Sequence, residues 1–372
     1  MDKTSILILT NNLGGLFSFR KEVVKAIIDS GFDVVISSPP STEKKTDYFR
    51  VIGCRIVDVP VDRRGTNPLR DFRLVGCYLK LMRATKPGAV LTYTVKPNIY
   101  GGIAAQWLQI PQLANITGLG DAIENPGWLQ KFTIFMYRVG LRKAKKVFCP
   151  NSLIQDFCKR NHVGGENCLL PGSGVNLEWY GFQEYPLQND PIRFIIIGRV
   201  MKDKGIEEYC EMARMIRKKY PQVEFHILGR CEEHYEERLK ALQEEGIVIW
   251  HGSVADVRPF VKDSWCTIHP SYHEGMSNVL LQSCAAGRPV ITSNINGCKE
   301  AVDDGVNGYL CRVKDATDLT EKVERFINLP YSEKVQMGLA ARRKMEREFN
   351  RQVVIDAYLN EIKNIEIVNK MV

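Results

Sequence analysis

Glu274 opens a short loop of mostly small residues, Gly275, Met276, Ser277 and Asn278, that runs into a predicted helix over residues 278–286. Backbone N–H groups at the start of a helix lack intrahelical acceptors and carry a partial positive charge, which suits phosphate groups. A carboxylate only accepts hydrogen bonds, which suits sugar hydroxyls. The segment therefore predicts a site for a nucleotide-sugar. The alternative is a carboxylate that only interacts with the helix dipole, worth about 0.3–1 kcal/mol.

A second candidate lies where a predicted strand over residues 194–197 ends. Arg199 and Lys204 follow this strand within the run 197–205. Open α/β sheets bind ligands beyond the carboxyl ends of their strands. There, arginine offers a planar fork of donors to a diphosphate and lysine offers a point charge. The alternative interpretation is a basic loop that is simply solvated.

Two further candidates follow predicted strands in the first half of the chain. Gly14 and Gly15 come after the strand at 5–10, where glycine would let the backbone approach a diphosphate closely. A plain tight turn would need the same residues. Lys96 follows the strand at 89–93 and could reach the donor sugar or its diphosphate. Otherwise it is a surface lysine ahead of a proline turn.

These motifs resemble those of the retaining glycosyltransferases of family 4, which have the GT-B fold. The segment 272–287 is similar to the family's E-x7-E region, and the run 197–205 is similar to its Gly-Arg and Lys-Gly phosphate-binding motif. The segments 117–120 and 171–176 resemble loops of bacterial capsule and lipid-linked oligosaccharide transferases. One position departs from the pattern, because Gln282 stands where the family has its second glutamate.

The resemblance implies roles for these residues. Glu274 would contact the donor sugar, with the backbone N–H groups that follow it, as far as Val279, facing the sugar and phosphates. Arg199 and Lys204 would neutralise the leaving nucleoside diphosphate, which makes these two and Glu274 the expected catalytic residues. The family's second glutamate typically holds the donor ribose. Gln282 keeps an amide acceptor there but lacks the charge and the paired oxygens.

Two loops in the first half of the chain also receive roles from the resemblance. The loop of Gly14 and Gly15 would face the donor phosphates. Thr117 and Gly118, in the segment Thr117-Gly118-Leu119-Gly120, would border the acceptor, and Lys96 is retained as a sugar-binding candidate.

Alternating strands and helices predict an α/β protein with two doubly wound, Rossmann-like parallel sheets. Residues 1–182 would form an acceptor domain and residues 191–350 a donor domain, joined by the polar stretch 183–191. By the resemblance, the two would face each other across a cleft, and a final helix at about 351–372 would cross back to the first domain. The expected strands are 5–10, 32–37, 89–93, 111–115, 146–149, 194–197, 224–228, 248–251, 266–269 and 289–292, and the expected helices include 17–30, 205–219, 235–245 and 332–349.

The charge of the chain is uneven. The 372 residues carry a net +8, but residues 1–150 hold 22 Lys and Arg against 11 Asp and Glu, a net +11. This excess predicts an anionic partner on the N-terminal side. No zinc-finger spacing, RNA-binding aromatic motif or long basic run points to nucleic acid. A lipid diphosphate at a membrane surface is the favoured partner.

The segment 128–146 mixes aromatic and basic residues. Such a helix can lie in a membrane interface. An ordinary helix with its apolar side in the core would show the same composition.

The remaining composition predicts a cytoplasmic protein. Eleven cysteines without a C-x-x-C pair indicate reduced thiols. We expect neither a signal peptide nor a transmembrane helix, since the longest uncharged run, 97–120, contains polar residues. No metal is expected, because the histidines lie near no cysteine cluster with ligand spacing and an Asp-x-Asp motif is missing.

The sequence thus predicts a metal-independent, retaining glycosyltransferase, peripheral at the cytoplasmic face of the membrane. It would move a hexose or N-acetylhexosamine from a UDP-sugar to a polyprenyl-diphosphate-linked saccharide, as in capsule, O-antigen or glycoprotein glycan assembly. Two alternatives stay open. One is a GT-B-fold sugar-nucleotide epimerase, and the other, suggested by Gln282, is an inactive sugar-nucleotide-binding subunit of a synthase.

Overall fold

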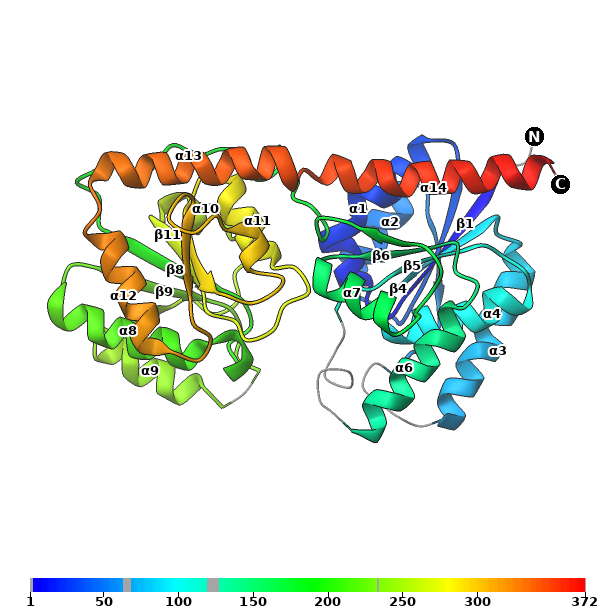
Figure 1. Cartoon of the computed structure of the whole chain (residues 1–372), viewed down its shortest axis with the longest axis horizontal. Helices are drawn as coiled ribbons and strands as arrows, with labels where there is room; N and C mark the ends of the chain where they lie inside the picture. Colours follow the sequence, from blue (N-terminus) through cyan, green and yellow to red (C-terminus); the bar gives the residue numbers. More distant parts are fainter. Residues whose placement is uncertain (1–2, 63–67, 119–126, 233, 372) are drawn as a thin grey trace. The chain divides into compact units, whose positions relative to one another are not determined.

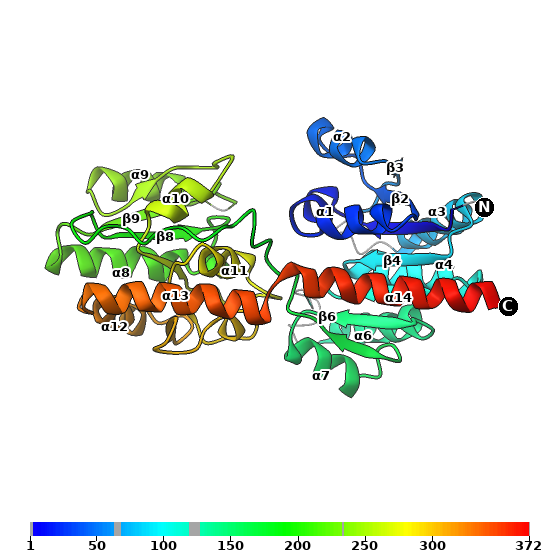
Figure 2. The same cartoon turned by 90° about the horizontal axis from the view of Figure 1, so that it is seen from above.

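The computed structural model describes residues 3–62, 68–118, 127–232 and 234–371. Its contacts divide the chain into two units, Met1–Ser173 with Gln352–Val372, and Gly174–Arg351. Each unit is a parallel sheet covered by helices (Figures 1 and 2). Residues 174–182, expected in the first domain, belong to the second unit. The N–H of Val175 donates to the carbonyl of Phe349 at 2.8 Å, and the N–H of Arg351 donates to the carbonyl of Val175 at 3.0 Å.

The sheet of unit 1 has the strand order β3-β2-β1-β4-β5-β6-β7. The chain moves outward from β1 to β3 and then returns to add β4 on the other side of β1. The point where the order reverses therefore lies between β1 and β4. The strands are β1 (Ser5–Thr10), β2 (Asp33–Ser38), β3 (Arg55–Asp58), β4 (Ala89–Tyr93), β5 (Gln112–Asn115), β6 (Lys146–Cys149) and β7 (Asn167–Leu169).

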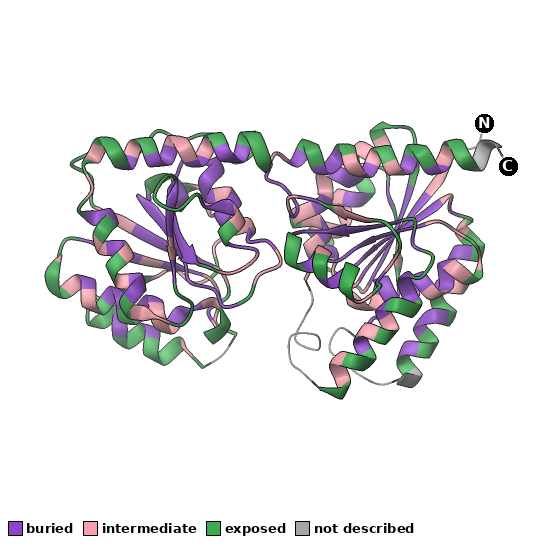
Figure 3. Cartoon of the chain, in the orientation of Figure 1, coloured by how far each residue is buried: buried purple, intermediate pink, exposed green. Residues whose placement is uncertain are grey.

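Helices cover both faces of this sheet. They are α1 (Leu13–Asp29), α2 (Glu43–Val51), α3 (Pro68–Thr85), the π-helix η1 (Pro97–Gly101), α4 (Gly102–Trp107), α6 (Trp128–Leu141), α7 (Ser152–Arg160) and α14 (Arg351–Met371). Alternate residues of a strand point to opposite faces. Ile6 and Ile8 accordingly pack in the cluster formed with α1 and α14, while Leu7 and Leu9 pack with α3 and α4. Both sets are buried, and Figure 3 shows that most of the sheet's strands are buried.

The last helix, α14, returns to unit 1, as predicted. Val354, Tyr358 and Ile362 are buried in the cluster that contains Ile6 and Ile8. The ring of Tyr358 lies 4.4 Å from that of Phe148 on β6, centroid to centroid. The C-terminal segment thus completes the core of the unit that the N-terminus begins.

Unit 2 has the strand order β10-β9-β8-β11-β12-β13, so its order reverses between β8 and β11. Phe194 and Ile196 of β8 pack with α8 and α12, whereas Ile195 and Ile197 face α10. The strands are β8 (Arg193–Ile197), β9 (Glu224–Leu228), β10 (Ile249–Trp250), β11 (Cys266–His269), β12 (Val290–Ser293) and β13 (Gly308–Cys311). The helices are η2 (Lys202–Lys204), α8 (Ile206–Lys219), α9 (Glu236–Glu244), α10 (Arg258–Asp263), α11 (Asn278–Ala285), η3 (Lys299–Ala301), α12 (Ala316–Ile327) and α13 (Tyr331–Glu348).

The predicted α/β class with two parallel sheets is confirmed, but the start of the first helix is corrected. This helix begins at Leu13 rather than at residue 17, so Gly14 and Gly15 lie in its first turn instead of in a loop. The N–H groups of Gly15 and Leu16 donate to the carbonyl of Asn12 at 3.1 and 3.2 Å. Burial of Leu13 and Leu16 outweighs the low helix propensity of the two glycines.

Candidate active site

The candidate site of unit 2 lies where the strand order reverses. Arg199 and Lys204 follow β8, and Glu274 follows the neighbouring β11. Because the strands are parallel, both loops leave the same edge of the sheet. Ligands of open α/β sheets bind at this place.

The two loops are joined directly. The N–H of Tyr272 donates to the carbonyl of Asp203 at 2.9 Å, and the Ser271 hydroxyl donates to the same oxygen at 3.2 Å. Gly205 has a φ of +71°, and a Cβ atom there would lie 2.1 Å from the carbonyl oxygen of Pro270. Only glycine permits this approach, so Gly205 allows Lys204 to reach the second loop.

Glu274 is held by two side chains. Its Oε1 lies 2.6 Å from Nζ of Lys204 and 2.9 Å from Nε2 of His269, the last residue of β11. Burial alone would raise the pKa of Glu274, but the hydrogen bonds and charges of His269 and Lys204 outweigh it and lower the pKa to about 2. The group is therefore a carboxylate at neutral pH and only accepts hydrogen bonds. Nε2 of His269 must then carry the proton of the bond that joins them.

A glycine outside the predicted motifs shapes the loop of Glu274. The N–H of Ser277 donates to the carbonyl of Gly297 at 2.7 Å, and the N–H of Gly297 donates to Oε2 of Glu300 at 2.7 Å. Gly297 has a φ of +87°, and a Cβ atom there would lie 2.4 Å from the carbonyl oxygen of Glu274. The loop after β12 thus supports the backbone of Glu274.

The predicted helix after Glu274 is α11, with Ser277 at its N-cap. Met276 and Ser277 are buried, while Gly275, Asn278 and Val279 are partly exposed. The first turn of α11 directs backbone N–H groups to the same edge of the sheet as Glu274. Gln282 lies one turn beyond Asn278 on the same helix face and is partly exposed.

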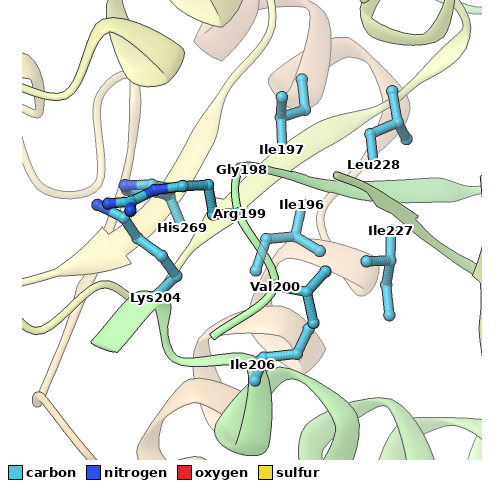
Figure 4. A pocket seen from close by; sticks show the side chains of 10 residues that line it. All are labelled: Ile196, Ile197, Gly198, Arg199, Val200, Lys204, Ile206, Ile227, Leu228 and His269. Carbon is cyan, nitrogen blue, oxygen red and sulfur yellow. The ribbon is translucent and has the colours of Figure 1, made fainter. Parts of the chain in front are cut away.

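Arg199 is bound to a carboxylate that the sequence analysis did not single out. Its Nη1 lies 2.7 Å from Oε2 of Glu232, whose other oxygen lies 2.8 Å from Nη2 of Arg230. Figure 4 shows the side chains of Arg199, Lys204 and His269 directed to one side of a pocket. The other side of the pocket is apolar, formed by residues such as Ile197 and Leu228. Two cations thus border one cavity.

In unit 1 the predicted residues follow the two strands at which the strand order reverses. Gly14 and Gly15 follow β1, and Lys96 follows β4. Lys96 is not a surface lysine: its side chain is 12% exposed, and its Nζ lies 2.5 Å from Oδ1 of Asp71. The other oxygen of Asp71 accepts a hydrogen bond from Tyr100 at 2.9 Å. The first sheet thus holds a cation at its carboxyl edge.

The predicted acceptor loop begins at the same edge, after β5. Thr117 is exposed and Gly118 is partly exposed. Leu119 and Gly120, which complete the predicted motif, lie outside the described residues.

The sequence analysis missed four residues of these sites, His269, Glu232, Asp71 and Gly297. His269 is the last residue of a correctly predicted strand, five positions before Glu274, and this position was a usable signal. Glu232, Asp71 and Gly297 gave no local signal, because each acts on a residue that is distant along the chain.

The described part of the chain shows neither a candidate metal-binding cluster nor a membrane-spanning helix. Among these residues, His, Cys, Asp and Glu form no group of three or more that could hold a metal ion, although His269 and His273 are only four positions apart. None of the described helices has both the length and the apolar character needed to span a bilayer.

Comparisons with known proteins agree with this architecture. A family profile described as glycosyl transferases group 1 matches residues 180–344, and one described as glycosyl transferase 4-like matches residues 6–151. The N,N'-diacetylbacillosaminyl-diphospho-undecaprenol alpha-1,3-N-acetylgalactosaminyltransferase of Campylobacter jejuni is 24% identical, with 94% of this chain and 97% of that protein covered.

Solved structures show the same fold. A glycosyltransferase from Rickettsia africae aligns with a TM-score of 0.81 at 18% identity, covering 98% of this chain and 99% of that one. HepE from Anabaena, solved in complex with UDP-glucose, aligns with a TM-score of 0.75 at 17% identity, covering 97% and 99%. With two matched profiles that together span most of its length, this chain belongs to the GT-B glycosyltransferases of the family 4 and group 1 type.

Proposed function

We propose that this protein transfers a hexose or N-acetylhexosamine, with retention at the anomeric carbon, from a UDP-sugar to a polyprenyl-diphosphate-linked saccharide. The observation that carries the proposal is the arrangement of Lys204, His269 and Glu274 where the strand order of unit 2 reverses. This arrangement combines a cation, which suits a diphosphate, with a group that is a carboxylate at neutral pH, which suits sugar hydroxyls.

The choice of substrates is supported by what similar proteins use. The Campylobacter jejuni relative is named as acting on a diphospho-undecaprenol-linked sugar. The Anabaena neighbour was solved with UDP-glucose. A lipid-linked acceptor would place the reaction at the cytoplasmic face of the membrane, as part of cell-surface polysaccharide or glycan assembly.

The proposed chemistry needs only the two substrates and groups that this chain supplies. The bond between the anomeric carbon and the diphosphate oxygen breaks, and the electron pair leaves with UDP. The acceptor hydroxyl forms the new bond on the same face, and its proton passes to a diphosphate oxygen. Arg199 and Lys204 stabilise the charge that develops on the leaving group. In this mechanism no metal takes part.

Glu274 is assigned an electrostatic and orienting role. With a pKa of about 2 it cannot donate a proton at neutral pH, so it is not a general acid. Its carboxylate would accept hydrogen bonds from the donor sugar and stabilise positive charge on the ring in the transition state. Oε1 already contacts Lys204 and His269, which fixes the direction of the group.

The test is release of nucleoside diphosphate from a panel of UDP- and GDP-sugars in EDTA, with and without a polyprenyl-diphosphate-linked sugar. We expect release that requires the acceptor, persists in EDTA and falls at least about 100-fold in Glu274→Ala. Thermal unfolding of the variant separates loss of chemistry from loss of fold.

The same assay decides between the proposal and its alternatives. UDP binding without release from any donor would indicate the inactive binding subunit. Conversion of the free sugar-nucleotide to its epimer without an acceptor would indicate the epimerase. Release abolished by EDTA and restored by Mg²⁺ would contradict the metal-independent mechanism.

A further inference from the structure

The helix α6 of unit 1 has apolar residues on two opposite faces. Tyr137 and Leu141 are buried in the core over β5 and β6, and Thr133 on the same side is also buried. A helix that only packs on a sheet would present polar residues on its other side. Instead, the outer face of α6 carries Trp128 (78% exposed), Phe132 (49%), Phe135 (57%) and Val139 (37%).

These outer residues form one continuous stripe. Their spacing of four, three and four positions places them along a single side of the helix. Large exposed apolar residues scattered singly are ordinary, but a contiguous set marks a surface that binds another protein, a ligand or a membrane. We call this set, Trp128, Phe132, Phe135 and Val139, the outer stripe.

The charge around the outer stripe has one sign. Residues 127–149 contain no Asp or Glu. Lys131, Arg138, Arg142, Lys143 and Lys145 are all exposed, and only Lys146 is buried, where it pairs with Glu166 and Glu361. An apolar stripe with flanking cations matches the boundary between the acyl chains and the anionic headgroups of a bilayer.

We infer that the outer stripe of α6 docks this enzyme on an anionic membrane surface, with the aromatic rings below the headgroups and the flanking cations among the phosphates. Thr117 and Gly118, the predicted acceptor residues, lie in the same unit, where they follow β5, and Figure 1 places α6 in that unit. The inference deepens the proposed function, on which it rests for the lipid-linked acceptor. It assigns to one helix the membrane contact that such an acceptor needs.

The experiment measures sedimentation of the full chain with vesicles of phosphatidylcholine, alone or mixed with phosphatidylglycerol. We expect binding to the mixed vesicles that weakens as salt is added. A variant with Trp128→Ser, Phe132→Ser and Phe135→Ser should bind about 100-fold more weakly. A variant with Lys131→Ser, Arg142→Ser and Lys143→Ser should lose a similar factor at low salt.

The control replaces other exposed apolar residues. Leu187 and Val306 are 69% and 57% exposed in unit 2, and their change to Ser should leave vesicle binding as it is. Thermal unfolding of every variant checks that the fold is kept. Vesicle binding that is unchanged by both α6 variants, or equal on vesicles without phosphatidylglycerol, would overturn the inference.

Quenching by brominated lipids locates the contact independently. The fluorescence of the wild type should be quenched on the mixed vesicles, and Trp128→Phe, which keeps an aromatic ring, should bind equally while losing most of the quenching. Quenching equal to that of the wild type would assign the membrane contact to another tryptophan and would contradict the inference. Self-association through α6 in place of vesicle binding would also contradict the inference, since the outer stripe would then contact a second copy of this chain.

A water-soluble, short-chain acceptor separates this inference from the proposed function. The aromatic variant should keep transfer to the soluble acceptor and lose transfer to an acceptor embedded in vesicles. A wild type that docks through α6 but transfers to neither acceptor would contradict only the proposed function. A wild type that transfers sugar but never binds vesicles would contradict only the docking.

Discussion

The Nζ atom of Lys204 lies 2.6 Å from Oε1 of Glu274, although 70 positions separate the two residues in the sequence. Both side chains are largely buried, at 19% and 16% exposure. The lysine would face the donor diphosphate and the carboxylate would face its sugar. Their contact therefore joins the two halves of the proposed donor site.

Loss of the carboxylate of Glu274 should cost stability as well as activity. Glu274→Gln keeps the shape but leaves Lys204 without its anionic partner in a mostly buried place. We expect the free energy of unfolding to fall by about 2–3 kcal/mol, measured by urea denaturation at pH 7. Glu237→Gln, on the exposed side of α9, is the matched control and should change it by less than about 0.5 kcal/mol. Equal effects of the two changes would contradict the ion-pair assignment.

The contribution of Glu274 should depend on pH in a defined window. Its pKa is about 2 in the folded protein against an ordinary value of 4.5. A lowered folded pKa stabilises the protein above the unfolded pKa, and this stabilisation disappears as the pH falls through the folded value. The stability difference between wild type and Glu274→Gln should be constant near neutrality and shrink between pH 4.5 and 2. A difference that grows toward low pH would contradict the assignment.

A methyl group at Gly297 should disturb the site. In Gly297→Ala, the new Cβ would lie 2.4 Å from the carbonyl oxygen of Glu274, so the loop must move. The control is Gly305→Ala, because Gly305 has a similar φ of +79° but nothing within 4 Å of the position of its Cβ. Both variants should lose about 1 kcal/mol to backbone strain. Only Gly297→Ala should also lower kcat/KM, by about 10-fold or more. Equal kcat/KM values would show that Gly297 does not position the site.

Arg199 and Arg230 offer a matched pair for the diphosphate site. Both contact Glu232, at 2.7 and 2.8 Å, but only Arg199 lines the pocket that Lys204 and His269 border. Arg199→Ala should lower kcat/KM by about 100-fold and weaken UDP binding, whereas Arg230→Ala should change either by less than about threefold. Titration calorimetry with UDP and steady-state kinetics give the two readouts. Similar losses in both variants would place the diphosphate elsewhere.

Substitutions at Gln282, which stands where the family has a glutamate, test the predicted contact with the donor ribose. Gln282 lies on α11 one turn beyond Asn278, and a carboxylate there would offer two acceptors in place of one. Gln282→Glu should tighten UDP binding by about threefold to tenfold and keep turnover, while Gln282→Ala should weaken binding. Tighter binding without any turnover in either the wild type or the variant would favour the inactive subunit. Unchanged UDP binding in both variants would show that Gln282 does not contact the nucleotide.

Much of the fold could be predicted from the sequence, because buried parallel strands are short continuous apolar runs. Five strands were predicted with the bounds that the structure shows, β1, β4, β6, β9 and β11. The strands β3 and β7 gave no such signal because none of their residues is buried. The strand β13 was also missed, although most of it is buried. Because glycine is a poor helix former, the sequence predicts a loop at the first residues of α1. The burial of Leu13 and Leu16, which offsets this low propensity, is visible only in the packed unit.

The sequence by itself determined which residues stand at the ends of strands, since this follows from local apolar runs and the residues after them. It thereby identified Arg199, Lys204 and Glu274 as donor-site candidates. Only the tertiary structure decided their partners: His269 and Lys204 for Glu274, Glu232 for Arg199, and Asp71 for Lys96. These contacts join segments that are brought together by the order of strands in each sheet. That order depends on the packing of all strands and helices at once, so no local pattern in the chain encodes it.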